Sequence, residues 1–329
     1  MYDRAFHQED ISKHTFLVTG GAGFIGSNIV TYLMKYNAGK VIVLDDLSNG
    51  YKKNIEQFIG QSNFQFIEGD ITDFELVSQV MKDVDYVTHQ AALGSVPRSI
   101  ENPLATHHAN TTGLLTILTC AKDTNVKRVV FASSSSVFGD SKELPKVESR
   151  IGRQLSPYAV SKRTKELYAQ VFADVYGLDV VGLRYFNVFG PNQSPNGPYA
   201  AAIPLFMEAV LNNTASYING DGEQSRDFTF VENAVQANIK AMFTDKEVKG
   251  EIINIAFGGR TTINELFFKI RAVVGNDIEP IYREDRPGDV KDSLADISLA
   301  KKLIDFNPEY SLEDGLAVTI DWFKKKFVN

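Results

Sequence analysis

The stretch that decides the fold is Thr15-Phe-Leu-Val-Thr-Gly-Gly-Ala-Gly-Phe-Ile-Gly26. Its first five residues are β-branched or apolar, which is typical of a buried parallel strand. The glycines at positions 20, 23 and 26 permit a tight turn, close approach of a pyrophosphate to the backbone, and close packing of helix on strand. Residues 27–36 have helical spacing, and residues 40–45 read as a second strand. The stretch therefore predicts a β–loop–α–β unit.

Strands and helices continue to alternate outward from this unit. We expect strands at 64–68, 84–90, 129–133 and 180–184, and helices at 73–81, 103–124 and 156–176. This alternation predicts an α/β fold, with a Rossmann-type doubly wound parallel sheet and helices on both faces.

The pattern changes after residue 187. A turn-rich loop at 191–198 is followed by shorter elements, among them a strand at 252–256 and a helix at 263–274. We therefore expect a large domain over 1–190, to which a segment near 228–256 returns. A smaller mixed domain over 191–329 is expected to bind the substrate.

Composition excludes several functional classes. The chain has 329 residues, 43% hydrophobic and 23% charged, with a net charge of −7 and no Lys/Arg-rich block, so nucleic acid is not an expected partner. The single cysteine, Cys120, forms no intrachain disulfide and no multi-cysteine metal site; we expect it buried and predict no metal. Residues 1–14 lack the apolar core of a signal peptide, and no apolar run approaches the roughly 20 residues of a membrane span. A cytoplasmic protein with no membrane partner is expected.

Asp45 ends the second strand, close to the spacing at which dinucleotide-binding folds place an acidic residue. Its carboxylate can accept hydrogen bonds from both ribose hydroxyls and would repel a 2′-phosphate, so NAD is favoured over NADP. The alternative is a plain turn, because Ser48-Asn49-Gly50 follows shortly afterwards. Asp70, after the third strand, is either an adenine contact or the cap of the next helix.

Tyr158 and Lys162 lie four positions apart on a predicted helix, so their side chains share one face. A tyrosine ionises near pH 10, and lowering its pKa to about 7 takes about 4 kcal/mol of differential stabilisation. One exposed lysine cannot supply this, whereas a lysine and an oxidised nicotinamide together can. Ser134 or Ser135, in a serine run ending the strand 129–133, can align a sugar hydroxyl with Tyr158; the alternative for that run is a Ser-rich turn.

At this point the chain resembles a known family. The motifs are Thr19-Gly-Gly-Ala-Gly-Phe-Ile-Gly-Ser27, the serine run before Val137-Phe-Gly-Asp140, and Ser156-Pro-Tyr-Ala-Val-Ser-Lys162. They resemble the extended short-chain dehydrogenase/reductases, and within them the nucleotide-sugar C4-epimerases. The likeness runs from about residue 14 to the C-terminus.

Further motifs narrow the resemblance. They are Arg184-Tyr-Phe-Asn-Val-Phe-Gly-Pro191, the stretch Gly220–Asp227, Arg286-Pro-Gly-Asp289 and, above all, His89–Ser99. They are similar to bacterial 4-epimerases of UDP-N-acetylglucosamine and its uronic acid. The resemblance implies reversible C4 epimerisation of UDP-GlcNAc to UDP-GalNAc through a 4-keto intermediate, in polysaccharide biosynthesis. NAD would take and return the hydride, with Tyr158 as the base, Lys162 holding the nicotinamide ribose and Ser134 assisting at O4.

The resemblance also implies two sets of contacts. The NAD contacts are Gly20, Gly23, Phe24, Ile25, Gly26, Asp45, Asn49, Gly50, Asp70, Ile71, Gln90, Ala91, Ala92, Asn110, Tyr158, Lys162 and Tyr185. The contacts with the UDP-sugar are Gly94, Ser95, Ser134, Ser135, Tyr158, Asn187, Tyr217, Asn219, Arg226, Arg286, Asp289 and Ser293. Among these, Asn187 and the two arginines would hold the diphosphate, Tyr217 and Asn219 the uracil, and Asp289 the uridine ribose. The alternative for Arg226 and Arg286 is an ion pair with Asp227 and Asp289.

Two positions depart from galactose-type epimerases. Gly94 stands where a lysine is often found, and Ser293 where a bulky tyrosine bounds the sugar pocket. A small side chain leaves room for an N-acetyl group, so we favour an N-acetylhexosamine over a UDP-glucose/UDP-galactose substrate.

Two other functions occur on similar folds, and the sequence argues against both. A nucleotide-sugar 4,6-dehydratase usually carries Asp-Glu where this chain has Ser135-Ser136, which argues against it. An NAD-sensing regulatory protein tends to lose the tyrosine or the lysine, and both are present. The resemblance also implies a homodimer formed through the helices at 103–124 and 156–176.

Overall fold

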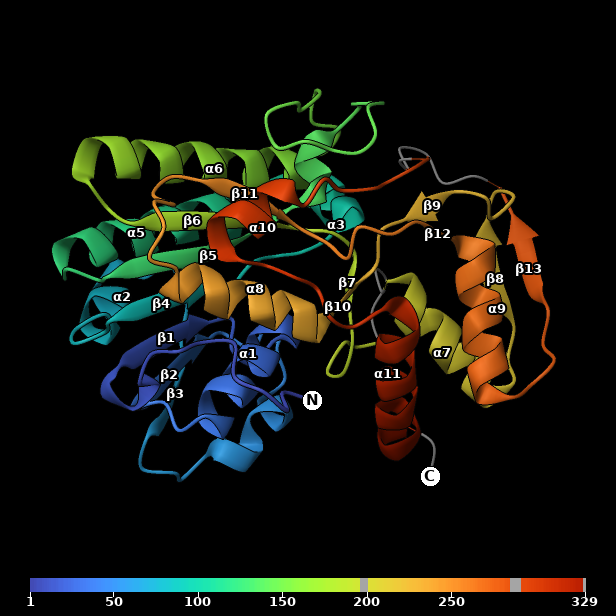
Figure 1. Ribbon diagram of the computed structural model, residues 1–329, viewed down its shortest axis with the longest axis horizontal. Coiled ribbons are helices and arrows are strands. Elements are labelled where there is room, and N and C mark those ends of the chain that lie inside the picture. The colour runs from blue at the N-terminus through green and yellow to red at the C-terminus, as the bar shows by residue number, and fades with distance from the viewer. Residues whose placement is uncertain (196–200, 285–290, 328–329) are drawn as a thin grey trace.

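The computed structural model describes residues 1–195, 201–284 and 291–327 (Figure 1). Its core is a seven-stranded sheet in the order β11-β6-β5-β4-β1-β2-β3, with every neighbouring pair parallel. The strands are β1 (Thr15–Thr19), β2 (Lys40–Asp45), β3 (Phe64–Glu68), β4 (Tyr86–His89), β5 (Arg128–Ser134), β6 (Val180–Tyr185) and β11 (Ile252–Ile255). The strand order reverses between β1 and β4, the point at which such sheets open a ligand crevice at their carboxyl ends.

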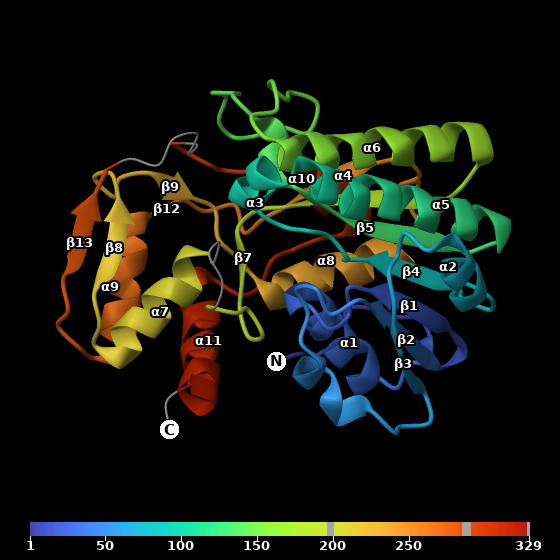
Figure 2. The same cartoon turned by 180° about the vertical axis from the view of Figure 1, so that it is seen from behind.

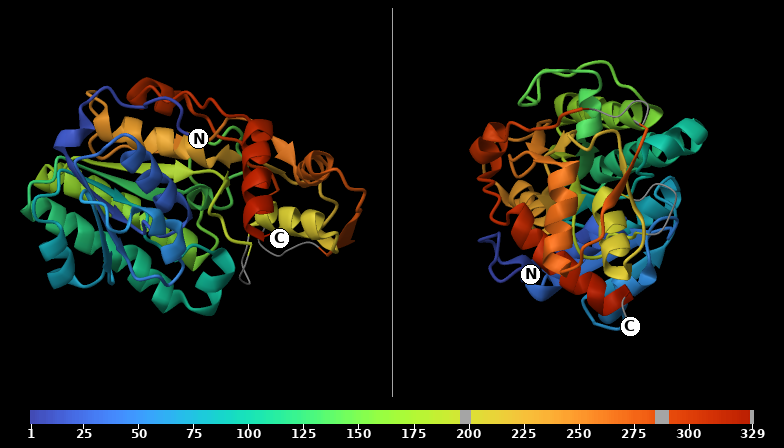
Figure 3. Two further views of the ribbon diagram at one scale, coloured as in Figure 1. Left: turned by 90° about the horizontal axis from the view of Figure 1, so that it is seen from below. Right: turned by 90° about the vertical axis from the view of Figure 1, so that its right-hand side faces the viewer.

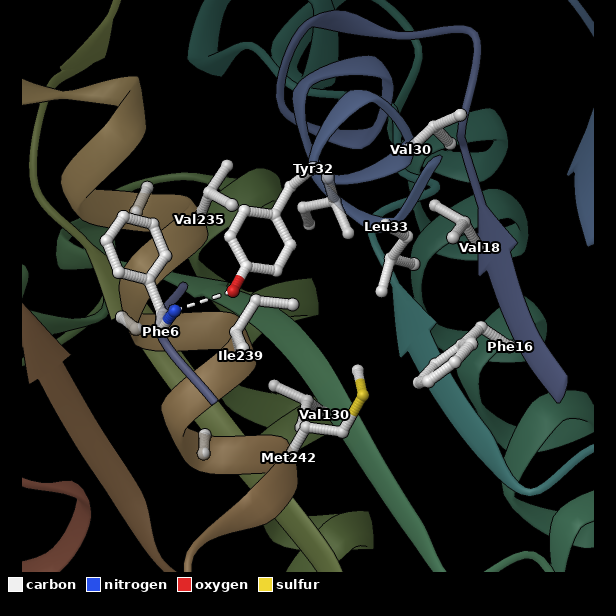
Figure 4. Packing of buried hydrophobic residues seen from close by; sticks show 14 of the residues in the cluster. Phe6, Phe16, Val18, Val30, Tyr32, Leu33, Val130, Val235, Ile239 and Met242 are labelled. Carbon is white, nitrogen blue, oxygen red and sulfur yellow. Dashed lines mark hydrogen bonds between the residues drawn. The ribbon is translucent and has the colours of Figure 1, made fainter. Parts of the chain in front are cut away.

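Helices cover both faces of the sheet, as the view along its edge shows (Figure 3). One face packs against α1 (Phe24–Lys35) and α8 (Val231–Phe243), and the other against α2 (Phe74–Val80), α5 (Gly113–Asp123) and α6 (Pro157–Tyr176). The predicted doubly wound α/β fold is therefore confirmed. The N-terminal segment closes the first of these layers: Phe6 stacks on Tyr32 of α1, and the Phe6 N–H donates to the Tyr32 hydroxyl at 2.6 Å (Figure 4).

The bounds of the predicted elements follow the sequence pattern closely, but one predicted helix is divided and several helices, α8 among them, were not predicted. The helix expected over 103–124 is α4 (Pro103–His107) and α5, joined by one π-helical turn at His108–Thr112. The helix α8 was not predicted, because its polar residues interrupt any apolar stripe. These residues are nevertheless buried and hydrogen-bonded, as Asn233 shows by donating to the Tyr310 carbonyl at 2.8 Å.

A smaller lobe lies beside the carboxyl ends of the strands (Figure 1). It consists of β8 (Ser216–Asn219) and β13 (Pro280–Arg283), which pair in parallel, β9 (Ser225–Arg226) and β12 (Thr261–Thr262), which pair in antiparallel fashion, and α7 (Ala202–Asn212), α9 (Ile263–Val274) and α11 (Leu312–Phe327). The link between the lobes is the pair β7 (Val188–Phe189) and β10 (Thr229–Phe230). A separate apolar core stabilises this lobe. Its members include Phe189, Phe206, Phe267 and Phe323.

The lobes are not continuous segments of chain. The segment 228–256 supplies α8 and β11 to the large lobe. So does α10 (Ser298–Ile304), which lies within the range 191–329 assigned to the smaller domain but packs on α8 and β11. The remaining helix is α3 (Val96–Glu101). In the described part of the chain, every helix is too short or too polar to cross a bilayer.

Candidate active site

A cavity of about 780 Å³ opens at the carboxyl ends of the central strands, where the two lobes meet. Its volume lies within the usual range of small-molecule sites. Its wall brings together segments that are far apart in sequence: the loop after β1, the ends of β2 to β6, the first turn of α6 and the linker after β7. The sequence arguments on the glycine loop and on Tyr158 therefore concern one site.

The loop after β1 leaves no room for side chains. Gly20 has a φ of +68°, and a Cβ there would lie 2.6 Å from the Ala91 nitrogen. A Cβ on Gly26 would lie 2.1 Å from the Gly20 carbonyl oxygen. Helix α1 begins at Phe24, and its N-cap, Gly23, makes no side-chain hydrogen bond, so the first N–H groups of the helix are left for a ligand. The loop thus fits a diphosphate.

Asp45, the last residue of β2, lies against this loop and is 6% exposed. It accepts hydrogen bonds from the N–H groups of Ala22 and Leu47, both at 2.9 Å. Burial raises the pKa of its carboxyl, and these backbone bonds oppose the rise. Its position on the cavity wall fits a contact with the hydroxyls of a ribose.

Asp70 also lines the cavity, and its Oδ1 accepts from the Thr72 N–H at 2.8 Å. The cap of α2 is instead Asp73, whose side chain accepts from the Leu76 N–H at 3.0 Å. The alternative reading of Asp70 as the helix cap is therefore wrong.

The catalytic candidates are placed by the start of α6. Ser156 is its N-cap, accepting from the Ala159 N–H at 3.1 Å, and Pro157 follows at the first helical position. This puts Tyr158 in the first turn, on the cavity wall with Ser134 at the end of β5. The Lys162 ammonium, one turn later, donates to the Ala132 carbonyl at 3.0 Å and lies 5.7 Å from the centre of the Tyr158 ring.

Burial shifts the pKa values of the two ionisable side chains at this site. Desolvation raises the pKa of Tyr158, and a hydrogen bond with Ser134 opposes that rise. Burial lowers the pKa of Lys162 to about 8, with Glu166 acting in the opposite direction. Tyr158 therefore keeps its proton at neutral pH in the protein alone. To act as a base, Tyr158 would need a further positive charge nearby, and an oxidised nicotinamide ring would supply one.

A buried ion pair holds α6 on the sheet. Glu166, which is fully buried, accepts from the Arg184 Nε at 2.7 Å and from the Ser133 hydroxyl at 2.7 Å. Its other oxygen accepts from Arg163 at 2.9 Å. The pair fixes Tyr158 relative to Ser134, because it ties one turn of α6 to β5 and β6. The sequence analysis missed it, although a charge at the end of the apolar strand 180–184 indicates a buried partner.

The cavity gathers most of the predicted cofactor contacts. The residues of that set that line it are Gly20, Gly23, Phe24, Ile25, Gly26, Asp45, Asn49, Gly50, Asp70, Ile71, Gln90, Ala91, Ala92, Tyr158, Lys162 and Tyr185. Asn110 does not: it is fully buried and donates to the Ser161 hydroxyl at 3.0 Å while accepting from the Leu93 N–H at 2.8 Å. It shapes the cavity by holding the loop after β4.

The predicted substrate contacts fall into two groups. Gly94, Ser134, Ser135, Tyr158 and Asn187 line the cavity. Tyr217, Asn219, Arg226 and Ser293 belong to the smaller lobe outside it, and Ser95 caps α3 by accepting from the Arg98 N–H. Arg286 and Asp289 lie outside the described residues.

Several contacts were not foreseen from the sequence. His108, at the π-helical turn, and Gln193 and Ala201, beside the linker, also line the cavity, but no motif marks them. In the smaller lobe, Arg283 donates to the Asn219 side chain at 2.6 Å, and its guanidinium lies 5.4 Å from the centre of the Tyr217 ring. A pairing of neighbouring strands β8 and β13 brings these three together, and sequence alone does not reveal it.

Comparison with known proteins places the chain in a family. Residues 16–256 match the model of the NAD dependent epimerase/dehydratase family. A putative UDP-glucose 4-epimerase of Methanocaldococcus jannaschii is 39% identical over 310 residues, 94% of this chain and 98% of that protein.

Two solved structures are similar over nearly the whole chain. A UDP-N-acetylglucosamine 4-epimerase of Methanobrevibacter ruminantium, in complex with UDP-N-acetylmuramic acid, has a TM-score of 0.91 and 43% identity, covering 95% of this chain and 99% of that one. A dTDP-glucose 4,6-dehydratase of Streptomyces venezuelae with NAD bound has a TM-score of 0.88 and 32% identity, covering 95% and 97%. This protein is a member of the NAD-dependent epimerase/dehydratase family.

Proposed function

We propose that this protein is a UDP-sugar 4-epimerase and that its preferred reaction is the interconversion of UDP-GlcNAc and UDP-GalNAc, or of their uronic acid forms. One observation carries the proposal: Tyr158, Lys162 and Ser134 share a single cavity with a diphosphate-binding loop, and no carboxylate stands beside them at positions 135 and 136. A 4,6-dehydratase needs an acid there to expel water from C6. The cavity offers the groups for oxidation at C4.

Each side chain at the site has its own role in the proposed reaction. The phenolate of Tyr158 takes the proton of the sugar O4 hydroxyl, and Ser134 aligns that hydroxyl. Bound NAD would supply the acceptor for the C4 hydride and the donor for its return. Lys162 holds a positive charge near the phenolate and is expected to bind the nicotinamide ribose. Tyr158 then returns the proton to O4 of the turned sugar.

Turning the sugar without losing it requires an anchor at the nucleotide. Arg226 of β9 and Asn187 at the linker are the described candidates for the diphosphate, together with Arg286 from outside the described residues. Guanidinium groups match phosphate oxygens well. With the diphosphate held, the ring can present either face of C4 to the same hydride-accepting atom.

The choice of an N-acetylated sugar rests on small side chains. Gly94 lines the cavity, and a Cβ there would meet no atom within 4 Å. Ser293, at the tyrosine position of galactose-type epimerases, is 9% exposed and its N–H donates to the Ser225 carbonyl at 3.1 Å. The solved UDP-N-acetylglucosamine 4-epimerase at 43% identity supports the same choice. UDP-glucose is the competing substrate, because the M. jannaschii relative is a putative UDP-glucose 4-epimerase.

The experiment is to incubate the purified protein with UDP-GlcNAc, and separately with UDP-glucose, without added NAD, and to identify the product sugars. We expect UDP-GalNAc from the first and a slower reaction with the second. A 4-keto-6-deoxy sugar would show a dehydratase instead. No turnover of either sugar, by protein shown to contain NAD, would contradict the proposal and favour a regulatory NAD-binding protein.

A further inference from the structure

Behind the cavity wall, four side chains form a closed hydrogen-bonded network: Thr88, Gln90, Tyr185 and Asn238. Gln90 and Tyr185 line the cavity, and we call these two side chains the amide wall. Thr88 of β4 and Asn238 of α8 are fully buried behind it. Helix α8 thus reaches the site only through the side chains that it holds in place.

Every polar hydrogen of these four side chains is donated in a hydrogen bond within the network or to the backbone. Gln90 Nε2 donates to Thr88 Oγ1 at 2.9 Å and to Asn238 Oδ1 at 3.0 Å, and Thr88 donates to the same oxygen at 3.2 Å. Asn238 Nδ2 donates to the Tyr185 hydroxyl at 2.7 Å and to the Ala234 carbonyl at 2.8 Å. Tyr185 donates its one proton to Gln90 Oε1 at 3.3 Å.

The side chains of Gln90 and Tyr185 can therefore only accept hydrogen bonds from a ligand. A side-chain amide has two N–H donors and a hydroxyl has one, and all of them are used within the network. Burial raises the pKa of Tyr185 to about 12, so the phenol keeps its proton and stays a donor to Gln90. Gln90 Oε1 and the Tyr185 oxygen, on residues that line the cavity, can still accept a hydrogen bond.

We propose that Asn238 is a positioning residue that fixes the amide wall as acceptor-only, and that the wall binds the N–H₂ group of the nicotinamide carboxamide. Tyr185 is paired in register with Ser134, so the wall lies beside the catalytic serine, where hydride transfer must occur. The carboxamide is the one part of that ring with N–H donors. An acceptor-only wall takes its nitrogen and rejects its oxygen, which selects one orientation of the amide.

The test compares two NAD analogues that differ in this group. The thionicotinamide analogue keeps the N–H₂ and changes the carbonyl oxygen to sulfur, whereas the 3-acetylpyridine analogue keeps the carbonyl and replaces the N–H₂ by methyl. Their affinities for the full-length chain, freed of bound cofactor, are measured by calorimetry. We expect the thio analogue to bind within about threefold of NAD and the acetylpyridine analogue roughly tenfold more weakly, as the loss of one hydrogen bond predicts. Equal binding of the two analogues overturns the proposal.

Two substitutions assign the selectivity to the network. In Asn238→Leu the Gln90 amide loses its fixed partner and can present an N–H, so the preference between the analogues should fall below about threefold. Asn233→Leu removes another buried asparagine of α8, whose side chain bonds to the backbone of residues 309 and 310, and should keep the preference. An equal loss of affinity for all three dinucleotides in Asn238→Leu would show a purely structural role and overturn the proposal.

If Asn238→Leu does not fold, Thr88→Val tests whether the network sets the preference between the two analogues. Valine keeps the shape of threonine but leaves one Gln90 N–H without its acceptor. The preference for the thio analogue should then decrease by at least half, and an unchanged preference contradicts the inference. All readouts are of cofactor binding, so they are independent of which sugar the enzyme turns over.

Discussion

Glu166 of α6 and Arg184 of β6 form a two-point ion pair, with 2.7 Å between Nε and Oε1 and 2.9 Å between the second pair of atoms. Both side chains are at most 2% exposed. Parallel bonds between a guanidinium and a carboxylate fix direction as well as distance. The pair therefore sets the rotation of α6, and with it the position of Tyr158 at the helix start.

Breaking this pair should destabilise the whole protein. Arg184→Met leaves a buried carboxylate without its main partner, which typically costs about 3–5 kcal/mol of unfolding free energy. Urea denaturation measures the loss. The control is Asp321→Asn, which breaks an exposed pair with Lys325 on α11 and should change the unfolding free energy by less than about 1 kcal/mol. Equal effects of the two substitutions would contradict the assigned role.

Tyr158→Phe should lower kcat by about 10²- to 10⁴-fold, because it removes the group that exchanges the O4 proton. Bound NAD, measured after protein denaturation, should remain near the unsubstituted level. Tyr168→Phe removes a partly exposed hydroxyl of the same helix and should leave kcat unchanged. Full activity of Tyr158→Phe would exclude the proposed base.

Lys162 should reduce stability at neutral pH. Its pKa is lowered to about 8 in the folded protein, below the unfolded value near 10.5. Below pH 8 both states carry the proton, and the folded state bears a desolvation cost of about 3 kcal/mol. This cost disappears as pH rises from 8 to 10.5, because the folded state gives up its proton first.

Lys162→Met should therefore be more stable than the unsubstituted protein at pH 7, and the difference should vanish near pH 10.5. Urea denaturation across this range measures it. Lys324→Met, at an exposed position of α11, should show no such trend. A difference that is constant with pH would mean that the pKa of Lys162 is not lowered in the folded protein.

The sequence revealed those parts of the site that depend on local geometry. Glycines at 20, 23 and 26 and a strand-ending Asp45 are readable because turn conformation and strand length fix their positions. The Tyr158–Lys162 spacing is readable because a helix places both on one face. By contrast, the contact of Gln90 with Asn238 joins residues 148 positions apart, and that of Arg283 with Asn219 joins residues 64 apart. Such pairs depend on the packing of whole elements, which periodicity does not encode.

We expect the protein to form a homodimer through α4 and α6, which lie side by side on one face (Figure 2). This face exposes apolar side chains that a monomer would leave in water: Leu104 is 81% exposed, Val175 67% and Val171 49%. Light scattering after gel filtration should give twice the chain mass of 36.5 kDa.

The pair of substitutions Leu104→Asp and Val171→Asp should shift the protein to the monomer, because a buried unpaired charge is costly. Val273→Asp places the same charge on an exposed position of α9 in the smaller lobe and should leave the mass unchanged. A monomeric unsubstituted protein would refute this assembly.

The sugar preference can be reversed at one position if Ser293 bounds the sugar pocket. Ser293→Tyr adds a phenol ring at a position where, by the proposal, the small side chain leaves room for an acetamido group. We expect kcat/KM for UDP-GlcNAc to fall by at least about tenfold, the scale at which a steric clash or lost contact of 1–3 kcal/mol is seen. The value for UDP-glucose should change little, because that sugar carries only a hydroxyl at C2.

Ser293→Ala is the matched control and should leave both values of kcat/KM unchanged. A Ser293→Tyr variant that loses both activities equally would indicate that the ring disturbs the backbone contact with Ser225. In that event the N-acetyl preference would have to be set elsewhere in the pocket.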